Sequence, residues 1–182
     1  MITNKTREIL VKKQAELDQL IVEKSNTNLK WISHFNAERL KLALLVEVGE
    51  FANEIKSFKA WRKKQEIDWT KAKEELIDCL GYFLGLCNIY RIDFPFNFTP
   101  KNQDWTFNKL LLDFFAKTNN LFILKKPDLY NLEKVEIANQ SSYHEWLKTF
   151  QELCGKLPID EKELLDVYLH KNKINQERAK AK

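Results

Sequence analysis

The sequence is poor in the two residues that make most tight turns. It has four Gly and four Pro among 182 residues. A β-sandwich or a β-barrel joins many short strands through turns rich in these residues, whereas long helices need few of them. The shortage therefore argues against an all-β architecture and favours a mostly α-helical protein.

Cysteines and long apolar runs are also scarce. Cys79, Cys87 and Cys154 have no metal-type spacing, and the first two lie among apolar residues, so we expect buried free thiols and a reducing compartment. No apolar run reaches the roughly 18 residues that a membrane span needs. The N-terminal stretch MITNKTREIL lacks the apolar core of a signal peptide. These features predict a soluble, cytoplasmic protein.

The charge balance is only mildly positive. The net charge is +4, from 30 basic and 26 acidic side chains. A dedicated nucleic-acid binder usually concentrates Lys and Arg on one face, so this excess does not indicate one. The C-terminal KNKINQERAKAK is locally basic. It could be a solvated helix end or a group of side chains that binds phosphates.

Apolar residues recur at helical spacing along most of the chain, which predicts an all-α bundle with antiparallel core helices. Asp68 or Thr70 is expected to cap the third helix and Asp104 the fourth. Neither an internal repeat nor a linker interrupts the pattern, so we expect a single domain over 1–182. The expected helices cover 5–24, about 34–36 to 64, 71–90, 105–118, 142–153 and 160–178.

Two of these helices carry acidic residues within their most apolar parts. In the stretch LALLVEVGEFANEIKSF, Glu47 and Glu50 are three residues apart. In EELIDCLGYFLGL, Glu75 and Asp78 repeat that spacing. Residues three or four apart share a helix face. If the two helices pack antiparallel, the four carboxylates converge.

Converging carboxylates indicate a cation site. Two unit charges about 4 Å apart repel by on the order of 4 kcal/mol at an effective dielectric constant near 20, and a divalent cation would offset this repulsion. Oxygen donors without His or Cys suit Mg²⁺ or Mn²⁺ rather than Zn²⁺. The pattern therefore predicts a site in which Mg²⁺ holds a polyphosphate and activates a water.

A solvated helix face or a di-iron centre could also carry acidic residues at this spacing. E-x-x-E is common on solvated helices, but here apolar residues flank the motif and a second carboxylate pair follows it. A di-iron bundle requires Glu-x-x-His on two helices, which His34, His144 and His170 do not provide. A metal–polyphosphate site therefore remains the stronger interpretation.

The two motifs resemble the E-x-x-E…E-x-x-D signature of the all-α NTP pyrophosphohydrolase superfamily, which includes MazG-like proteins. Within it, EVGEFANEIKSFKAWRKK and KAKEELIDCLGYFL resemble the dimeric all-α dUTPases. KKQAELDQLI is similar to that family's first helix, and YLHKNKINQER to its C-terminal Lys-x-x-x-Asn-x-x-Arg element. The centre, about 91–140, gives little detailed match.

The resemblance implies an activity. It is the Mg²⁺-dependent hydrolysis of dUTP, and also of dUDP, which limits uracil in DNA and supplies dUMP; from dUTP the other product is pyrophosphate. Two or more Mg²⁺ or Mn²⁺ ions would be bound with the substrate. Glu47, Glu50, Glu75 and Asp78 would be the metal ligands, and Glu50, with Glu47, would act on the attacking water. A homodimer is implied, and neither a nucleic acid nor a membrane is expected as a stable partner.

The resemblance also implies a substrate site. Gln14 matches the position that reads the uracil edge, with Asp18 beside it. In the C-terminal element, Lys171, Asn175 and Arg178 match positions that grip sugar and phosphate. Side chains around FKAWRKK are expected near the phosphates and the base pocket: Lys56, Lys59, Trp61, Arg62, Lys63 and Lys64.

Two alternatives stay open on the sequence alone. A dCTP or broad-specificity NTP pyrophosphohydrolase would share the carboxylates and differ in the base pocket, at Gln14 and Asn175. A non-enzymatic helical protein could keep the bundle and use its basic C-terminus for an interaction with protein or nucleic acid.

Overall fold

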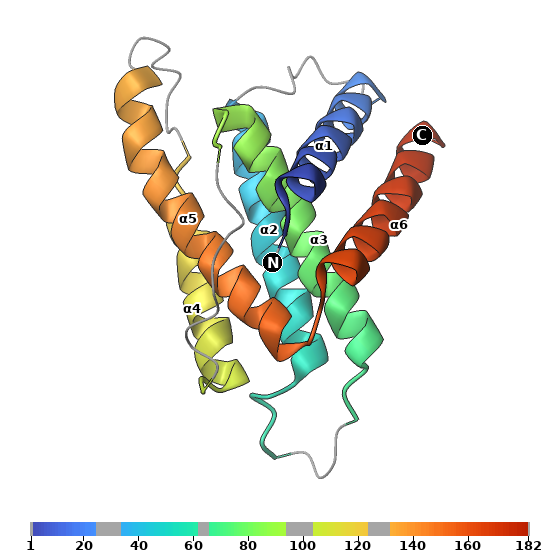
Figure 1. Ribbon diagram of the computed structural model, residues 1–182, viewed down its shortest axis with the longest axis vertical. Coiled ribbons are helices and arrows are strands. Elements are labelled where there is room, and N and C mark those ends of the chain that lie inside the picture. The colour runs from blue at the N-terminus through green and yellow to red at the C-terminus, as the bar shows by residue number, and fades with distance from the viewer. Residues whose placement is uncertain (1, 25–33, 62–65, 94–103, 124–131, 182) are drawn as a thin grey trace.

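The computed structural model describes residues 2–24, 34–61, 66–93, 104–123 and 132–181, and within these ranges it contains α-helices and no strands. The all-α prediction is confirmed (Figure 1). The helices are α1 (Asn4–Lys24), α2 (His34–Ile55), α3 (Trp69–Tyr90), α4 (Phe107–Asn120), α5 (Leu132–Lys156) and α6 (Glu161–Lys180).

An antiparallel pair, α2 and α3, forms the centre of the bundle (Figure 1). The apolar stripe of each helix faces the other, because apolar residues at helical spacing gather on one face. Carboxylates that share these faces are therefore held between two packed helices. The fully buried residues of the pair include Leu44, Val48 and Phe51 from α2 and Leu76, Leu80 and Phe83 from α3.

The outer helices flank this pair on two sides. α1 and α6 pack against each other and both contact α3, while α4 and α5 pack together and α4 contacts α2 (Figure 1). The ring of Trp146 in α5 stacks on Phe83 at 4.0 Å between centroids, which ties α5 to α3. The indole Nε1 of Trp146 donates a hydrogen bond to Thr118 Oγ1 at 2.9 Å, so its polar atom is satisfied inside the core.

Helix caps agree with the sequence at one predicted position and differ at another. Asp68 caps α3, as predicted, by accepting a hydrogen bond from the Lys71 backbone N–H. The prediction that Asp104 caps the fourth helix is wrong. Thr106 does so instead, through its hydroxyl oxygen and the Lys109 N–H, and the helix begins at Phe107.

Two helix boundaries also differ from the expectation. α2 ends at Ile55 rather than near residue 64, because Lys56 adopts a left-handed backbone with φ of 57°. α5 begins at Leu132 rather than at 142. The sequence did not predict its first part, because that part is mostly polar and gives little apolar periodicity. The first boundary matters for function, because the basic segment after Lys56 does not continue along α2.

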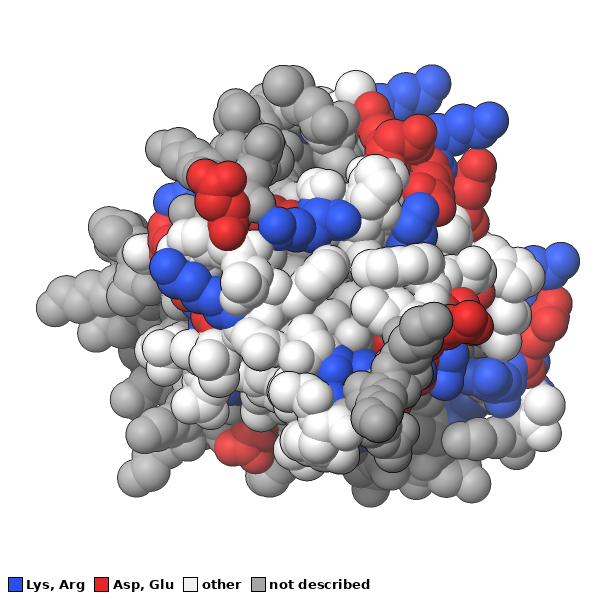
Figure 2. Space-filling model, turned by 90° about the horizontal axis from the view of Figure 1, so that it is seen from below, with Lys and Arg blue, Asp and Glu red and all other residues white. Residues whose placement is uncertain are grey.

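The thiols and the surface bear on the predicted compartment and partners. Cys79, Cys87 and Cys154 are free and buried. Among the described residues, no helix combines the length and apolarity that crossing a bilayer requires. On the face shown in Figure 2, basic and acidic side chains are interspersed with uncharged ones, so the described part of that face has no concentrated basic patch.

Candidate active site

Three carboxylates meet between the central helices. Glu47 on α2 and Glu75 and Asp78 on α3 each offer one oxygen, and these oxygens all lie within 4.8 Å of one another. Glu75 and Asp78 share a face because they are three residues apart on one helix. The antiparallel packing of α2 and α3 then places Glu47 opposite them. The expected convergence is found for these three residues, which we call the carboxylate cluster.

The electrostatics of the carboxylate cluster favour a positive charge. Burial raises the pKa of Glu47 to about 7, and the neighbouring charges of Asp78, Glu50 and Glu75 contribute to that rise. Burial also raises the pKa of Glu75 and of Asp78, against the opposing effect of Lys171. Because ionised carboxylates repel one another here, a bound cation would stabilise the ionised form of all three.

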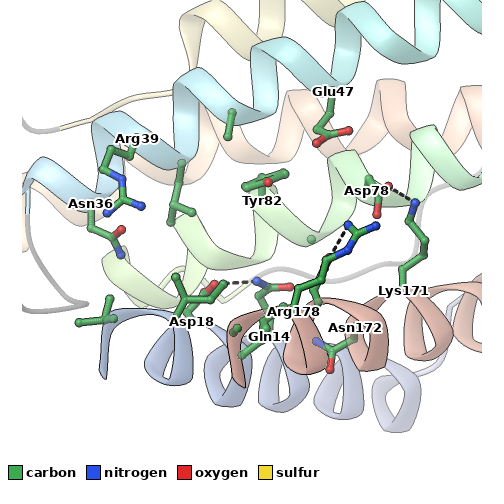
Figure 3. Close-up of a pocket in the computed structure, with 18 of the residues that line it drawn as sticks. Gln14, Asp18, Asn36, Arg39, Glu47, Asp78, Tyr82, Lys171, Asn172 and Arg178 are labelled. Atoms are coloured by element: carbon green, nitrogen blue, oxygen red, sulfur yellow. Dashed lines mark hydrogen bonds and ion pairs between the residues drawn. The ribbon is translucent and has the colours of Figure 1, made fainter. Parts of the chain in front are cut away.

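Lys171 supplies one positive charge from α6. Its Nζ lies 2.6 Å from Asp78 Oδ2. A dashed line marks this ion pair in Figure 3. Burial lowers the pKa of Lys171, but the hydrogen bond to Asp78 and the charges of Asp78 and Glu75 outweigh burial, so the net pKa is raised. A predicted phosphate-binding residue thus contacts a predicted metal ligand directly.

Glu50 lies apart from the carboxylate cluster. It is exposed, one turn along α2 from Glu47, and is not among the oxygens that fall within 4.8 Å. Its charge nevertheless contributes to the raised pKa of Glu47, Glu75 and Asp78. Glu54, one turn further, pairs with Lys71 at 2.9 Å. The fourth predicted ligand is therefore near the cluster but on its solvent side.

A cavity of about 710 Å³ opens beside the carboxylate cluster, lined by α1, α2, α3 and α6. Asp78 and Lys171 lie toward one end of it, Asn36 and Arg39 toward the other, and Gln14 between them (Figure 3). A volume of this size suits a small-molecule site. One elongated cavity therefore joins the acidic groups to the predicted base-reading residues.

Gln14 and Asp18 form a buried polar pair on α1. Gln14 Nε2 donates to Asp18 Oδ1 at 2.7 Å, and the Tyr168 hydroxyl on α6 donates to Gln14 Oε1 at 2.9 Å. A Cβ at Gly81 would come within 3.3 Å of Gln14 Oε1, and one at Gly85 within 2.9 Å of Asp18 Oδ2. Two glycines on α3 therefore leave the space that this pair occupies.

One carboxylate oxygen of Asp18 has no hydrogen-bond partner among the described residues. This oxygen, Oδ2, is buried, although the side chain lines the cavity. Burial raises the pKa of Asp18 to about 7, opposed by the hydrogen bond from Gln14. A buried acceptor without a partner is unfavourable unless a ligand supplies a donor.

The C-terminal element reaches the same cavity. Lys171, Asn175 and Arg178 all line it, although they come from the far end of the chain. Arg178 Nη1 donates to Asn175 Oδ1 at 3.4 Å. Residues predicted to grip sugar and phosphate are thus brought beside the carboxylate cluster and Gln14.

Three of the residues predicted around FKAWRKK are described by the structure and lie away from the cavity. Lys56, Lys59 and Trp61 are not among its lining residues, and Trp61 is 74% exposed. Lys59 Nζ instead lies 5.3 Å from the centroid of the Phe58 ring. Arg62, Lys63 and Lys64 lie outside the described residues. The predicted roles of these six residues stay predictions.

Other lining residues were not predicted from the sequence. Tyr168 and Asn172 are buried on α6, and Asn172 Nδ2 donates to the Lys13 carbonyl at 3.2 Å. Their helical spacing from Lys171 and Asn175 could have revealed them, since residues three or four apart share a face. Asn36 and Arg39, in the first turns of α2, had no such signal.

Comparison with known proteins identifies the family of the chain. A family model described as dUTPase matches residues 7–182, which include most of α1, both carboxylate motifs and the C-terminal element. Comparison with curated proteins gave no match. The family match favours dUTP over the two alternatives left open by the sequence. The chain belongs to the all-α dUTPase family and is a dUTP diphosphatase.

Proposed function

We propose that Glu47, Glu75 and Asp78 hold a divalent cation, Mg²⁺ or Mn²⁺, during the hydrolysis of dUTP. The observation that carries this proposal is the approach of their oxygens to within 4.8 Å of one another between α2 and α3. The donors are all carboxylate oxygens, the type that these hard cations prefer. Glu50, on the solvent side, would add a fourth carboxylate when two or more ions are bound with the substrate.

Glu50 and Glu47 would act on the water that attacks the phosphate chain. When bound, a divalent cation supplies neutralisation of phosphate charge and activation of a water. Glu50, with Glu47, would orient that water and accept its proton, because Glu50 lies on the exposed side of the carboxylate cluster where solvent can reach it. Phosphoryl chemistry depends mainly on positioning and charge stabilisation, so no covalent nucleophile is needed.

Lys171 and Arg178 would bind the phosphates. A triphosphate brings several negative charges into a cavity that already contains acidic groups. Transfer of Lys171 from Asp78 to a phosphate oxygen would free Asp78 for the cation and keep Lys171 paired. Asn175, beside Arg178, would contact the sugar. The same contacts would hold dUDP, which has the same base and sugar and two of the phosphates.

Gln14 and Asp18 would read the base. Uracil presents an N3–H donor between two carbonyl acceptors. The unpartnered Oδ2 of Asp18 could accept the N3–H, while the second N–H of Gln14 could donate to a carbonyl. Cytosine presents an acceptor at N3, which the carboxylate would repel. This arrangement supports selectivity for uracil over cytosine.

We also propose that the protein is a homodimer. Leu42 and Val46, one turn apart on α2, are 65% and 51% exposed and line the cavity, so a second copy of the chain that covered them would bury apolar surface. A homodimer measured by light scattering would support this arrangement.

The three buried free thiols fit a reducing compartment such as the cytoplasm.

The metal role is tested by Glu47→Gln, with Glu54→Gln as the matched control on the same helix. Glu47→Gln should reduce dUTP turnover by about 10²-fold or more, because it removes one charged donor at the reacting centre. Glu54→Gln should keep activity, since Glu54 pairs with Lys71 outside the carboxylate cluster. Pyrophosphate release over a Mg²⁺ titration measures both. Full activity of Glu47→Gln with unchanged Mg²⁺ dependence would refute the proposal.

A further inference from the structure

Tyr168 is a buried hydroxyl that reaches the base-reading pair from another helix. It lies on α6, is 3% exposed, and its OH is 2.9 Å from Gln14 Oε1. The backbone carbonyl of Leu10, at 3.3 Å, is a second and more distant acceptor. Burial raises the pKa of Tyr168, and the charge of Asp18 raises it further, so the hydroxyl keeps its proton. A permanent donor therefore faces the Gln14 amide.

The direction of the Gln14 amide follows from its two neighbours. In the ionised form that would accept the uracil N3–H, Asp18 only accepts hydrogen bonds, so the NH₂ of Gln14 faces its Oδ1, at 2.7 Å. The amide oxygen then points the opposite way and needs a donor. The Tyr168 hydroxyl is placed to be that donor. A flipped amide would set its oxygen against Asp18 and present an acceptor where a uracil carbonyl also accepts.

We propose that Tyr168 is a positioning residue for base selection. It holds the Gln14 amide with its NH₂ toward Asp18 and toward the base, and it does so without contacting the carboxylate cluster. The inference rests on the proposed base contact of Gln14. In this proposal α6 has two roles: Tyr168 orients the Gln14 amide, and Lys171, which lines the same cavity, would bind the phosphates.

Tyr168→Phe tests this role because it removes only the hydroxyl. Without the donor, the Gln14 amide is free to rotate, and the contact with uracil is weakened in the ground state and the transition state alike. The KM for dUTP should rise roughly five- to tenfold with kcat nearly unchanged. The preference for dUTP over dCTP, measured as a ratio of kcat/KM, should fall by a similar factor. An unchanged KM and preference would overturn the inference.

Tyr143→Phe is the matched control. Tyr143 is fully buried on α5, and its OH donates to the Phe122 carbonyl at 3.1 Å, away from the cavity. Its loss should lower the melting temperature without moving the KM for dUTP. If Tyr143→Phe raised the KM as much as Tyr168→Phe, the effect would come from general destabilisation and the inference would be wrong.

A double-mutant cycle separates positioning from a direct role. In a Gln14→Ala background, Tyr168→Phe should have no further effect on the KM for dUTP, because the amide it orients is gone. An additive effect would overturn the inference while leaving the base contact of Gln14 intact. An unchanged KM in Gln14→Ala alone would instead refute that base contact. Calorimetric binding of a non-hydrolysable dUTP analogue gives a second measurement of each variant.

Discussion

Asp78 Oδ2 and Lys171 Nζ lie 2.6 Å apart and join α3 to α6 at the edge of the cavity. The Asp78 side chain is 16% exposed and that of Lys171 25%, so water screens the pair only partly. In the proposed function, Asp78 would bind the cation and Lys171 would bind the phosphates. Binding of the substrate and the cation would therefore break this ion pair, and each partner would gain a new contact in its place.

Lys171→Met should reveal this competition. Met keeps most of the length of the side chain and removes the charge, so Mn²⁺ no longer competes with Lys171 for Asp78. In the absence of nucleotide, Mn²⁺ affinity should rise about fivefold, which corresponds to about 1 kcal/mol for a partly screened pair. The KM for dUTP should rise at the same time, since a phosphate contact is lost. Isothermal titration calorimetry and steady-state kinetics measure the two effects.

Lys73→Met is the control for that prediction. Lys73 Nζ on α3 pairs with Glu163 Oε1 on α6 at 2.7 Å, between the same two helices but with a carboxylate outside the cluster. Its loss should leave Mn²⁺ affinity unchanged. A fall in Mn²⁺ affinity on Lys171→Met would contradict the competition.

The dependence of activity on Mg²⁺ should itself depend on pH. The pKa of Glu47 is raised to about 7, so below that pH the carboxyl holds a proton, which a cation must displace. The Mg²⁺ concentration for half-maximal activity should therefore fall as the pH rises from 6 to 8, by up to about tenfold per unit below the pKa. Saturating Mg²⁺ should flatten the profile, and Glu54→Gln should keep it. A half-maximal concentration independent of pH would argue against a cation at Glu47.

The sequence predicts the helices and the carboxylate cluster well, because both depend on short-range spacing. Glu75 and Asp78 are three residues apart on one helix, and the apolar stripes decide that α2 and α3 face each other. The position of Glu47 opposite them follows from that packing. Local spacing was enough to predict that these two helices exist and which faces they bury, although it did not give the end of α2.

Other features depend on contacts that spacing cannot show. The end of α2 is set by the left-handed backbone of Lys56, and Lys is not a residue that favours this conformation. The choice of Thr106 over Asp104 as a cap depends on one hydrogen bond. Tyr168 meets Gln14 only because α1 and α6 pack together. Such long-range pairings become visible only in three dimensions.

Gly85→Ala and Gly49→Ala should change stability in opposite directions. At Gly49 a Cβ would meet nothing within 4 Å, so alanine should stabilise α2 by about 0.5–1 kcal/mol. At Gly85 it would lie 2.9 Å from Asp18 Oδ2 and 3.1 Å from Leu40 Cδ1, and such crowding costs about 1–3 kcal/mol. Urea unfolding compares the free energies of unfolding. In the Gly85→Ala background, Asp18→Ala should relieve the part of the crowding that Asp18 causes, and an equal gain at both glycines would disprove the close approach of α1 and α3.

Asp18→Asn should become more stable than the wild type as the pH rises. Burial raises the pKa of Asp18 from its ordinary 3.8 to about 7, so between these values the folded chain holds a proton that the unfolded chain releases. Wild-type stability therefore falls through this window and stays lower above it, because ionising the buried carboxyl is unfavourable. Asparagine has no proton to lose and still offers an oxygen to Gln14. Its advantage should be near zero at pH 4 and on the order of 2–4 kcal/mol at pH 8.

Urea midpoints measured from pH 4 to 8 on both proteins test this prediction, with Glu16→Gln as the control on the same helix. Glu16 is accessible to solvent, and the hydrogen bond from Lys13 lowers its pKa, so its removal should make the chain no more stable at high pH. Parallel pH profiles for wild type and Asp18→Asn would mean that Asp18 ionises as easily in the fold as in water. The carboxyl would then have no need of a donor from the base, and selection of uracil would have to rest on Gln14 alone.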